Sequence, residues 1–117
     1  MNWIALDTEE KLNELTEKSK NSRVLIFKFK PRDIISILIR GLLERYWHSG
    51  EMEMELFFLN VAEQPDLSDK VDSIFGLKTD IPSILIIENK KCIYTASSGQ
   101  IDYNKIRAFS NLYKNLS

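Results

Sequence analysis

The chain has 117 residues, the length of one domain spanning residues 1–117, and its 16 basic and 17 acidic residues give a net charge of −1. A charge so close to zero argues against nucleic-acid binding, because affinity for a phosphate backbone needs a basic surface. The single cysteine excludes an intramolecular disulfide, and the single histidine leaves too few nitrogen and sulfur ligands for a zinc site.

The first residues predict a short strand at a sheet edge, followed by a helix. Trp3 to Leu6 form a brief apolar run that turns acidic too early for a signal peptide. Thr8, or its neighbour Asp7, can cap a helix that continues to about Ser19. No apolar run approaches the length of a membrane span, so we expect a cytoplasmic protein.

Residues 24–47 predict a buried strand, a tight corner and a long helix. The strand is Val24–Phe29, a short run rich in branched and aromatic residues that ends before Pro31. The helix begins at Asp33, whose carboxylate can accept the free amide protons of the first turn. This order places an anion-favouring helix end at the carboxyl edge of a strand, where α/β proteins commonly carry their chemistry. The residues expected on the core face of the helix are Ile35, Leu38, Ile39, Leu42, Leu43 and Tyr46.

Two apolar residues of this helix and the residues that end it need an explanation. Ile37 points away from the expected core face, so either another part of the chain or a partner must cover Ile37 and Trp47; we expect the chain itself to do so. His48 is expected as an exposed cap at the negative end of the helix dipole, with Gly50 as the left-handed stop.

The second half of the chain predicts two more buried strands, a helix between them and a closing hairpin. Alternating apolar residues from Met52 to Leu59 predict an inner or next-to-edge strand. Asn89 can take the positive φ of a tight turn. The remaining expected elements are a helix from Pro65 to Gly76 with Leu67, Val71, Ile74 and Phe75 inward, strands over 81–87 and 91–96, and a last helix from Tyr103 to Leu116 with Ile106, Phe109 and Leu112 inward.

The resulting order, β-α-β-α-β-α-β-β-α, is that of the thioredoxin-like α/β fold, a mixed central sheet flanked by helices. Ile81-Pro82 resembles the cis-proline dipeptide that faces the active-site corner in thioredoxin-like proteins. More narrowly, the whole chain resembles the monothiol bacilliredoxins, single-domain proteins associated with bacillithiol and redox homeostasis in bacteria. The matching positions are Asn2-Trp3-Ile4, Val24 to Lys28, Arg32, Ile35-Ser36 and Lys91 to Ser97.

The chain departs from this family at the corner itself. Family members carry the nucleophilic cysteine directly after the arginine of the corner, and here that position is Asp33. The amide dipoles of a helix start stabilise a thiolate and a carboxylate alike, but a carboxylate cannot exchange disulfides. Phe29, Lys30 and Pro31 also replace the family's histidine and hydroxyl residues.

Three residues have both a structural and a functional interpretation. Asp33 is expected to be a helix cap, with permanent imitation of the thiolate as the sharper alternative. Cys92 lies within an apolar strand and is expected to be largely buried and structural, with a displaced nucleophile as the alternative. Arg32 either holds an anionic ligand or forms a local ion pair with Asp33.

The first functional hypothesis is a redox-inactive relative of the bacilliredoxins, with no catalytic residue, metal or cofactor. It binds a low-molecular-weight thiol or an extended protein segment, as a monomer or weak dimer. The residues expected to bind are Pro31, Arg32, Asp33, Ile81 and Pro82, with a cis Ile81–Pro82 bond whose backbone faces the corner. The rival is a thiol-disulfide oxidoreductase that works through Cys92 or a partner's cysteine, and a third possibility is a stress-related structural protein without a ligand.

Overall fold

A five-stranded mixed sheet forms the centre of the computed structural model, which describes residues 2–48 and 50–112. The strands lie in the order β1-β3-β2-β4-β5. β1 and β2 both pair in parallel with β3, whereas β4 runs antiparallel to β2 and β5 antiparallel to β4. The strands are β1 (Trp3–Ala5), β2 (Val24–Phe29), β3 (Glu55–Asn60), β4 (Ser83–Glu88) and β5 (Lys91–Ser97).

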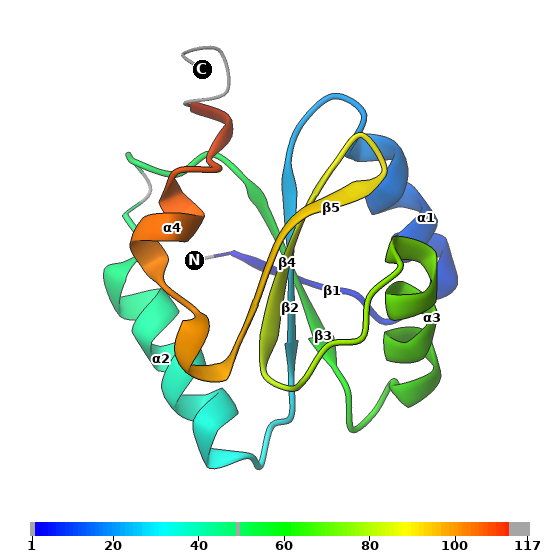
Figure 1. Ribbon diagram of the computed structural model, residues 1–117, viewed down its shortest axis with the longest axis horizontal. Helices are drawn as coiled ribbons and strands as arrows, with labels where there is room; N and C mark the ends of the chain where they lie inside the picture. Colours follow the sequence, from blue (N-terminus) through cyan, green and yellow to red (C-terminus); the bar gives the residue numbers. More distant parts are fainter. Residues whose placement is uncertain (1, 49, 113–117) are drawn as a thin grey trace.

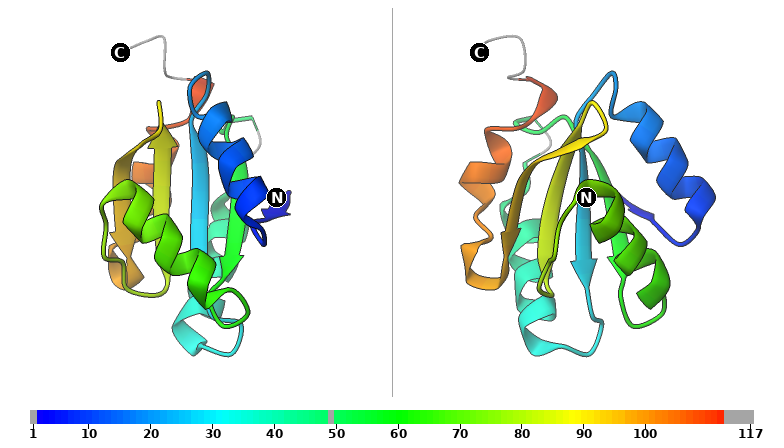
Figure 2. Two further views of the ribbon diagram at one scale, coloured as in Figure 1. Left: turned by 90° about the vertical axis from the view of Figure 1, so that its right-hand side faces the viewer. Right: turned by 45° about the vertical axis from the view of Figure 1, so that its right-hand side comes forward.

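Helices cover both faces of this sheet (Figure 1 and Figure 2). The helices are α1 (Glu9–Lys18), α2 (Ile34–Tyr46), α3 (Pro65–Phe75) and α4 (Tyr103–Arg107), with one 3₁₀ turn, η1 (Ser98–Gln100), before α4. α1 and α3 pack on one face through Leu12, Leu15 and Val71, and α2 and α4 pack on the other through Leu43 and Ile106. The order of elements is therefore the predicted one, with η1 added. Within the described residues, no helix is long and apolar enough to span a bilayer.

β2 is buried along its whole length, including the charged side chain of Lys28. The Lys28 ammonium donates to Asp72 Oδ1 at 2.6 Å, to the Ser68 carbonyl at 2.9 Å and to Thr79 Oγ1 at 3.2 Å. A buried charge is tolerated only when it is paired and hydrogen-bonded in this way. These contacts tie the central strand to α3 and to the segment that leads into Pro82.

The expected core face of α2 is largely wrong. Ile39 and Leu43 are buried as predicted, but Leu38 is 60% exposed, and Ile35, Leu42 and Tyr46 are also exposed. Periodicity could not place the core side, because this helix is apolar on nearly every side and the buried stripe includes a polar residue, Ser36. The prediction that the chain covers Ile37 is also wrong, because the Ile37 side chain is exposed. Trp47, in contrast, packs against the part of the core that α2 covers.

The last helix is shorter than predicted. α4 ends at Arg107, residues 108–112 follow a turning path, and Leu112 is exposed rather than inward. Side-chain hydrogen bonds hold that path: the Asn111 amide group pairs with the Arg23 backbone, and Ser110 Oγ accepts from the Glu53 amide at 2.7 Å. Residues 113–116 of the predicted helix lie outside the described residues.

Smaller corrections concern element ends. α2 ends at Tyr46 with an extended C-cap at Trp47, so Gly50 is not the residue that closes it, and Ser49 lies outside the described residues. β3 and β4 begin later than predicted, at Glu55 and Ser83. Ile74 is exposed rather than inward. The predicted end of the helix at Gly76 is confirmed, and Gly76 has a left-handed conformation (φ 66°). The positive φ that Asn89 was expected to tolerate is also confirmed (49°).

Asp72→Ala should lower the free energy of unfolding by about 3 kcal/mol, because it leaves the Lys28 ammonium buried without its counter-charge. Adding Lys28→Met should recover part of that loss, since the buried charge is then removed. Urea unfolding measures both effects. The control is Asp7→Ala, which breaks the exposed Lys11–Asp7 pair and should cost less than about 1 kcal/mol. Equal losses at the two sites would contradict this description of Lys28.

Candidate functional site

The corner between β2 and α2, the start of β4 and the η1 turn lie at the same end of the sheet (Figure 1). Lys28 pairs with Ser83 across the β2–β4 ladder, which places Pro82 beside the carboxyl end of β2. The Ser98 amide donates to the Pro82 carbonyl at 2.9 Å and holds the η1 turn against this segment. The Ile81–Pro82 peptide bond is cis, as predicted.

Asp33 is the N-cap of α2, as predicted. Its Oδ2 accepts from the Ser36 amide at 2.8 Å and from Ser36 Oγ at 2.9 Å. The Lys30 amide donates in turn to Ser36 Oγ at 3.2 Å. These three hydrogen bonds join the incoming strand, the corner and the first turn of the helix into one unit.

The chemistry open to Asp33 is electrostatic. Its carboxylate lies at the positive end of the α2 dipole and accepts the amide proton that a thiolate at this position would accept. Within residues 2–48 and 50–112, no hydrogen bond joins Asp33 to a histidine or to a second carboxylate, so no proton relay is built around it. The described residues also contain no cluster of acidic, histidine or cysteine side chains that could hold a metal ion.

Arg32 and Pro31 project from the corner into solvent. The expected alternative of an Arg32–Asp33 ion pair is not found, and Arg32 forms no ion pair with any described residue. Its guanidinium therefore adds positive potential at the helix start without a partner of its own.

Ile81 offers unused backbone groups beside the corner. Pro82 is buried, whereas Ile81 is only half-buried. Neither the N–H nor the C=O of Ile81 is hydrogen-bonded within the part of the chain that the structure describes. A donor and an acceptor in this position can pair with the backbone of an extended segment.

Cys92 lies far from these residues. It pairs with Ile87 at the end of β4 that is opposite Ser83, so about 13 Å of strand separate it from the corner. It is half-buried rather than largely buried, because β5 is an edge strand, and its Sγ contacts the Tyr94 carbonyl at 3.3 Å. Burial raises the pKa of the Cys92 thiol, although backbone hydrogen bonds oppose the effect. The structure does not bring Cys92 to the predicted site.

The sequence did not predict a cluster of interacting side chains behind the corner, centred on Arg40. The Arg40 guanidinium lies over the Phe29 ring, 5.5 Å from its centroid, and its Nε is 3.2 Å from Glu44 Oε1. Burial opposes ionisation of Glu44, but hydrogen bonds from Trp3 and Arg40 outweigh it and lower the pKa of that carboxyl. The four-residue spacing of Arg40 and Glu44 was visible in the sequence as a helix pair, whereas the stacking on Phe29 needs the tertiary structure.

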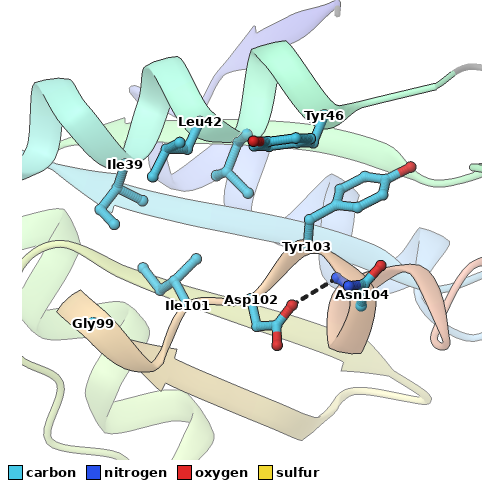
Figure 3. A pocket seen from close by; sticks show the side chains of 9 residues that line it. Ile39, Leu42, Tyr46, Gly99, Ile101, Asp102, Tyr103 and Asn104 are labelled. Atoms are coloured by element: carbon cyan, nitrogen blue, oxygen red, sulfur yellow. Dashed lines mark hydrogen bonds between the residues drawn. The ribbon is translucent and has the colours of Figure 1, made fainter.

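Two grooves border α2. One, of about 360 Å³, lies behind the corner and is lined by Phe29, Pro31, Ser36, Ile37, Arg40, Gly41 and Glu44. The other, of about 350 Å³, separates α2 from residues 99–104. Figure 3 shows Leu42 and Tyr46 on one side of it and Ile101 and Tyr103 on the other. The corner therefore lies at the start of α2, and a groove runs along each side of this helix.

Comparison with protein-family models gives a match to the model described as "Monothiol bacilliredoxin BrxC" over residues 4–106. A comparison with curated proteins gives no match.

Solved structures share the fold at low sequence identity. A protein described as a candidate oxidoreductase with a thioredoxin fold matches with a TM-score of 0.77 and 19% identity, over 89% of each chain. Thioredoxin from Fasciola hepatica matches with a TM-score of 0.68 and 19% identity, over 88% of this chain and 91% of that one. The N21Q mutant of Halobacterium salinarum thioredoxin gives 0.70 and 13%, over 96% and 90%. The predicted thioredoxin-like fold is confirmed.

The raised pKa of Cys92 predicts a measurable dependence of stability on pH. When the pKa of a group is higher in the folded state than in the unfolded state, the group contributes fully to stability at pH values below its unfolded-state pKa, which is about 8.5 for a thiol. That contribution is lost as the pH rises through the folded-state pKa. The free energy of unfolding of the parent should therefore fall more steeply above about pH 8.5 than that of Cys92→Ala. Parallel curves in urea titrations across this range would contradict the assignment.

Proposed function

The chain belongs to the monothiol bacilliredoxin family, and on that premise we propose that it is a redox-inactive member that binds through the corner instead of exchanging disulfides there. The observation that carries this proposal is the carboxylate of Asp33 at the start of α2. By resemblance this is the family's nucleophile position, and a carboxylate cannot form a mixed disulfide.

The proposed binding residues are Pro31, Arg32, Asp33, Ile81 and Pro82. The free N–H and C=O of Ile81 pair with the backbone of an extended protein segment or with the polar groups of a small thiol. Arg32, which has no ion-pair partner among the described residues, attracts a carboxylate on the ligand. The ligand class is inferred from these groups and from the family, whose name points to bacillithiol.

The rival function, disulfide exchange through Cys92, has less support. Its thiol lies at the opposite end of the sheet from the corner, and its raised pKa reduces the fraction of the reactive thiolate at neutral pH. Cys92 lies within β5, beside the turn that joins β4 and β5, and not at the start of a helix whose dipole could stabilise a thiolate. Exchange through a partner's cysteine would still use the corner as a binding surface.

Asp33→Cys in a Cys92→Ala background should recreate a reactive thiol. The amide of Ser36 and the charge of Arg32 would stabilise its thiolate, so its pKa should fall below the value of about 8.5 of a free thiol. The variant should then form mixed disulfides with bacillithiol disulfide faster than Cys92 does in the parent. Loss of the capping carboxylate should cost about 1 kcal/mol.

The thiol pKa is followed by ultraviolet absorbance of the thiolate and the exchange by mass spectrometry. A matched control places the new thiol at the other end of the sheet, as Lys91→Cys in the same Cys92→Ala background, where the residue begins a strand and not a helix. If the new thiol of the Asp33→Cys variant has the pKa of a free thiol and does not exchange, the corner no longer supports thiol chemistry. The differences from the family at Phe29, Lys30 and Pro31 would then explain the loss.

Binding to the parent can be followed by amide chemical shifts. Bacillithiol and its disulfide should shift the amides of Arg32, Asp33 and Ile81, and Arg32→Ala should weaken the affinity about tenfold, as expected for a lost charge-assisted contact. Lys91→Ala, an exposed cation at the far end of the sheet, should leave the affinity unchanged. Shifts confined to other residues would place the ligand elsewhere and refute the binding role of the corner.

A further inference from the structure

The outward face of α2 carries an unusual amount of exposed apolar surface. Ile34 is 72% exposed, and Ile37, Leu38 and Leu42 are also open to solvent. Continuous patches of large aliphatic side chains on a soluble protein mark interaction sites more often than chance exposure does. Nothing among the described residues covers this face of the helix.

The residues at the centre of the face follow the spacing of a helix-packing seam. Ile34, Leu38, Gly41 and Arg45 are separated by four, three and four positions, which is the alternation that keeps one stripe of a helix against another helix. We call these four residues the α2 seam. Ile37 and Leu42 flank it, one on each side. The seam therefore has the pattern of a surface that meets a second helix lengthwise.

Gly41 leaves a notch without a side chain in the middle of the seam. Glycine inside a helix costs about 1 kcal/mol relative to alanine. Gly41 does not have a positive φ, and a Cβ added there would meet no atom within 4 Å. Neither the local backbone nor internal packing requires glycine here, and the notch leaves room for a group from outside the subunit to come close to the helix.

We propose that the α2 seam binds the α2 seam of a second copy, antiparallel across a two-fold axis. The axis lies midway between Leu38 and Gly41, so the Leu38 side chain of each copy enters the notch at Gly41 of the other. Ile34 then lies against the aliphatic part of Arg45 of the other copy. This arrangement is isologous and closes as a dimer.

The charges at the two ends of the α2 seam favour a second copy of the chain as the partner, with its α2 antiparallel. Arg45 lies at one end of the seam, stacks on Tyr46 at 5.7 Å and has no ion pair within residues 2–48 and 50–112. Asp33 lies at the other end, and its Oδ1 accepts no hydrogen bond among those residues. Antiparallel copies bring Arg45 of each toward Asp33 of the other, whereas parallel copies bring like charges together. The surface is thus complementary to itself.

The expected affinity is modest. A contact through one helix of 13 residues buries less than the roughly 800 Å² per partner of a standard interface. We therefore expect a dissociation constant on the order of 10 µM, so that the monomer dominates in dilute solution. This proposal does not depend on the ligand-binding role of the corner, and its tests measure particle mass without any ligand.

The first test is sedimentation of the full chain over a concentration series that extends well above this constant. The parent should pass from monomer to dimer, and Leu38→Glu should weaken dimerisation at least about tenfold, because it places a charge in the notch of the other copy. The matched control is Ile74→Glu, a charge at an exposed isoleucine of α3 on the opposite face of the sheet, which should dimerise like the parent. Urea unfolding establishes that both variants remain folded. A parent that stays monomeric throughout, or equal effects of the two variants, would overturn the proposal.

The second test uses charge reversal to establish the direction of packing. Arg45→Glu and Asp33→Lys should each weaken the homodimer, because every Arg45–Asp33 contact becomes repulsive. An equimolar mixture of the two variants should form a heterodimer at least about tenfold tighter than either homodimer, since both contacts are then attractive. Loss of the cap in Asp33→Lys cannot produce this recovery. A mixture that associates no better than its separate components would overturn the antiparallel arrangement.

Discussion

The hydrogen bonds between Asp33 and Ser36 are the interaction on which the site depends. One carboxylate oxygen of Asp33 accepts hydrogen bonds from both the amide and the hydroxyl of Ser36, and that hydroxyl accepts one from the Lys30 amide. These bonds hold the end of β2 and the start of α2 together. The same contacts fix the chemistry. They place a carboxylate at the positive end of a helix, a position that would also stabilise a thiolate and that by resemblance is the family's nucleophile position. One side chain therefore both caps α2 and occupies the position on which the proposed loss of exchange chemistry rests.

A second constraint comes from the opposite face of the sheet. Lys28 is fully buried in β2, and its ammonium reaches Asp72 of α3 and Thr79, which stands three residues before Pro82. The segment that leads to Pro82 is thus tied to the central strand by the hydrogen bonds of a buried ammonium, which also reaches the Ser68 carbonyl. The pairing of Lys28 with Ser83 completes the connection. The corner and the Ile81–Pro82 segment belong to different parts of the sequence, but both are anchored to the same strand.

The sequence predicted the parts of this structure that are set locally. The cap at Asp33, the buried run of β2 and the end of α3 at Gly76 each follow from a few neighbouring residues. The sequence did not predict contacts between residues that lie far apart in the chain. Lys28 was visible as a lone charge in an apolar strand, but Asp72 and Thr79 lie more than forty residues away. The core side of α2 was misjudged because a helix with apolar residues on nearly every side carries little signal for the stripe that faces the sheet. That error is informative, since the apolar residues left over form the exposed face of α2. The end of α4 depends on Asn111 and Arg23, which no local pattern connects.

The account rests on the claim that the corner of this bacilliredoxin-family protein has kept its geometry and lost its exchange chemistry. The most direct measurement is mass spectrometry of the native parent after incubation with bacillithiol disulfide at neutral pH. We predict that the native chain keeps its unmodified mass, while the chain unfolded in urea gains one adduct on Cys92. Fast, stoichiometric formation of an adduct on the native protein would contradict the account, because Cys92 would then be a working nucleophile.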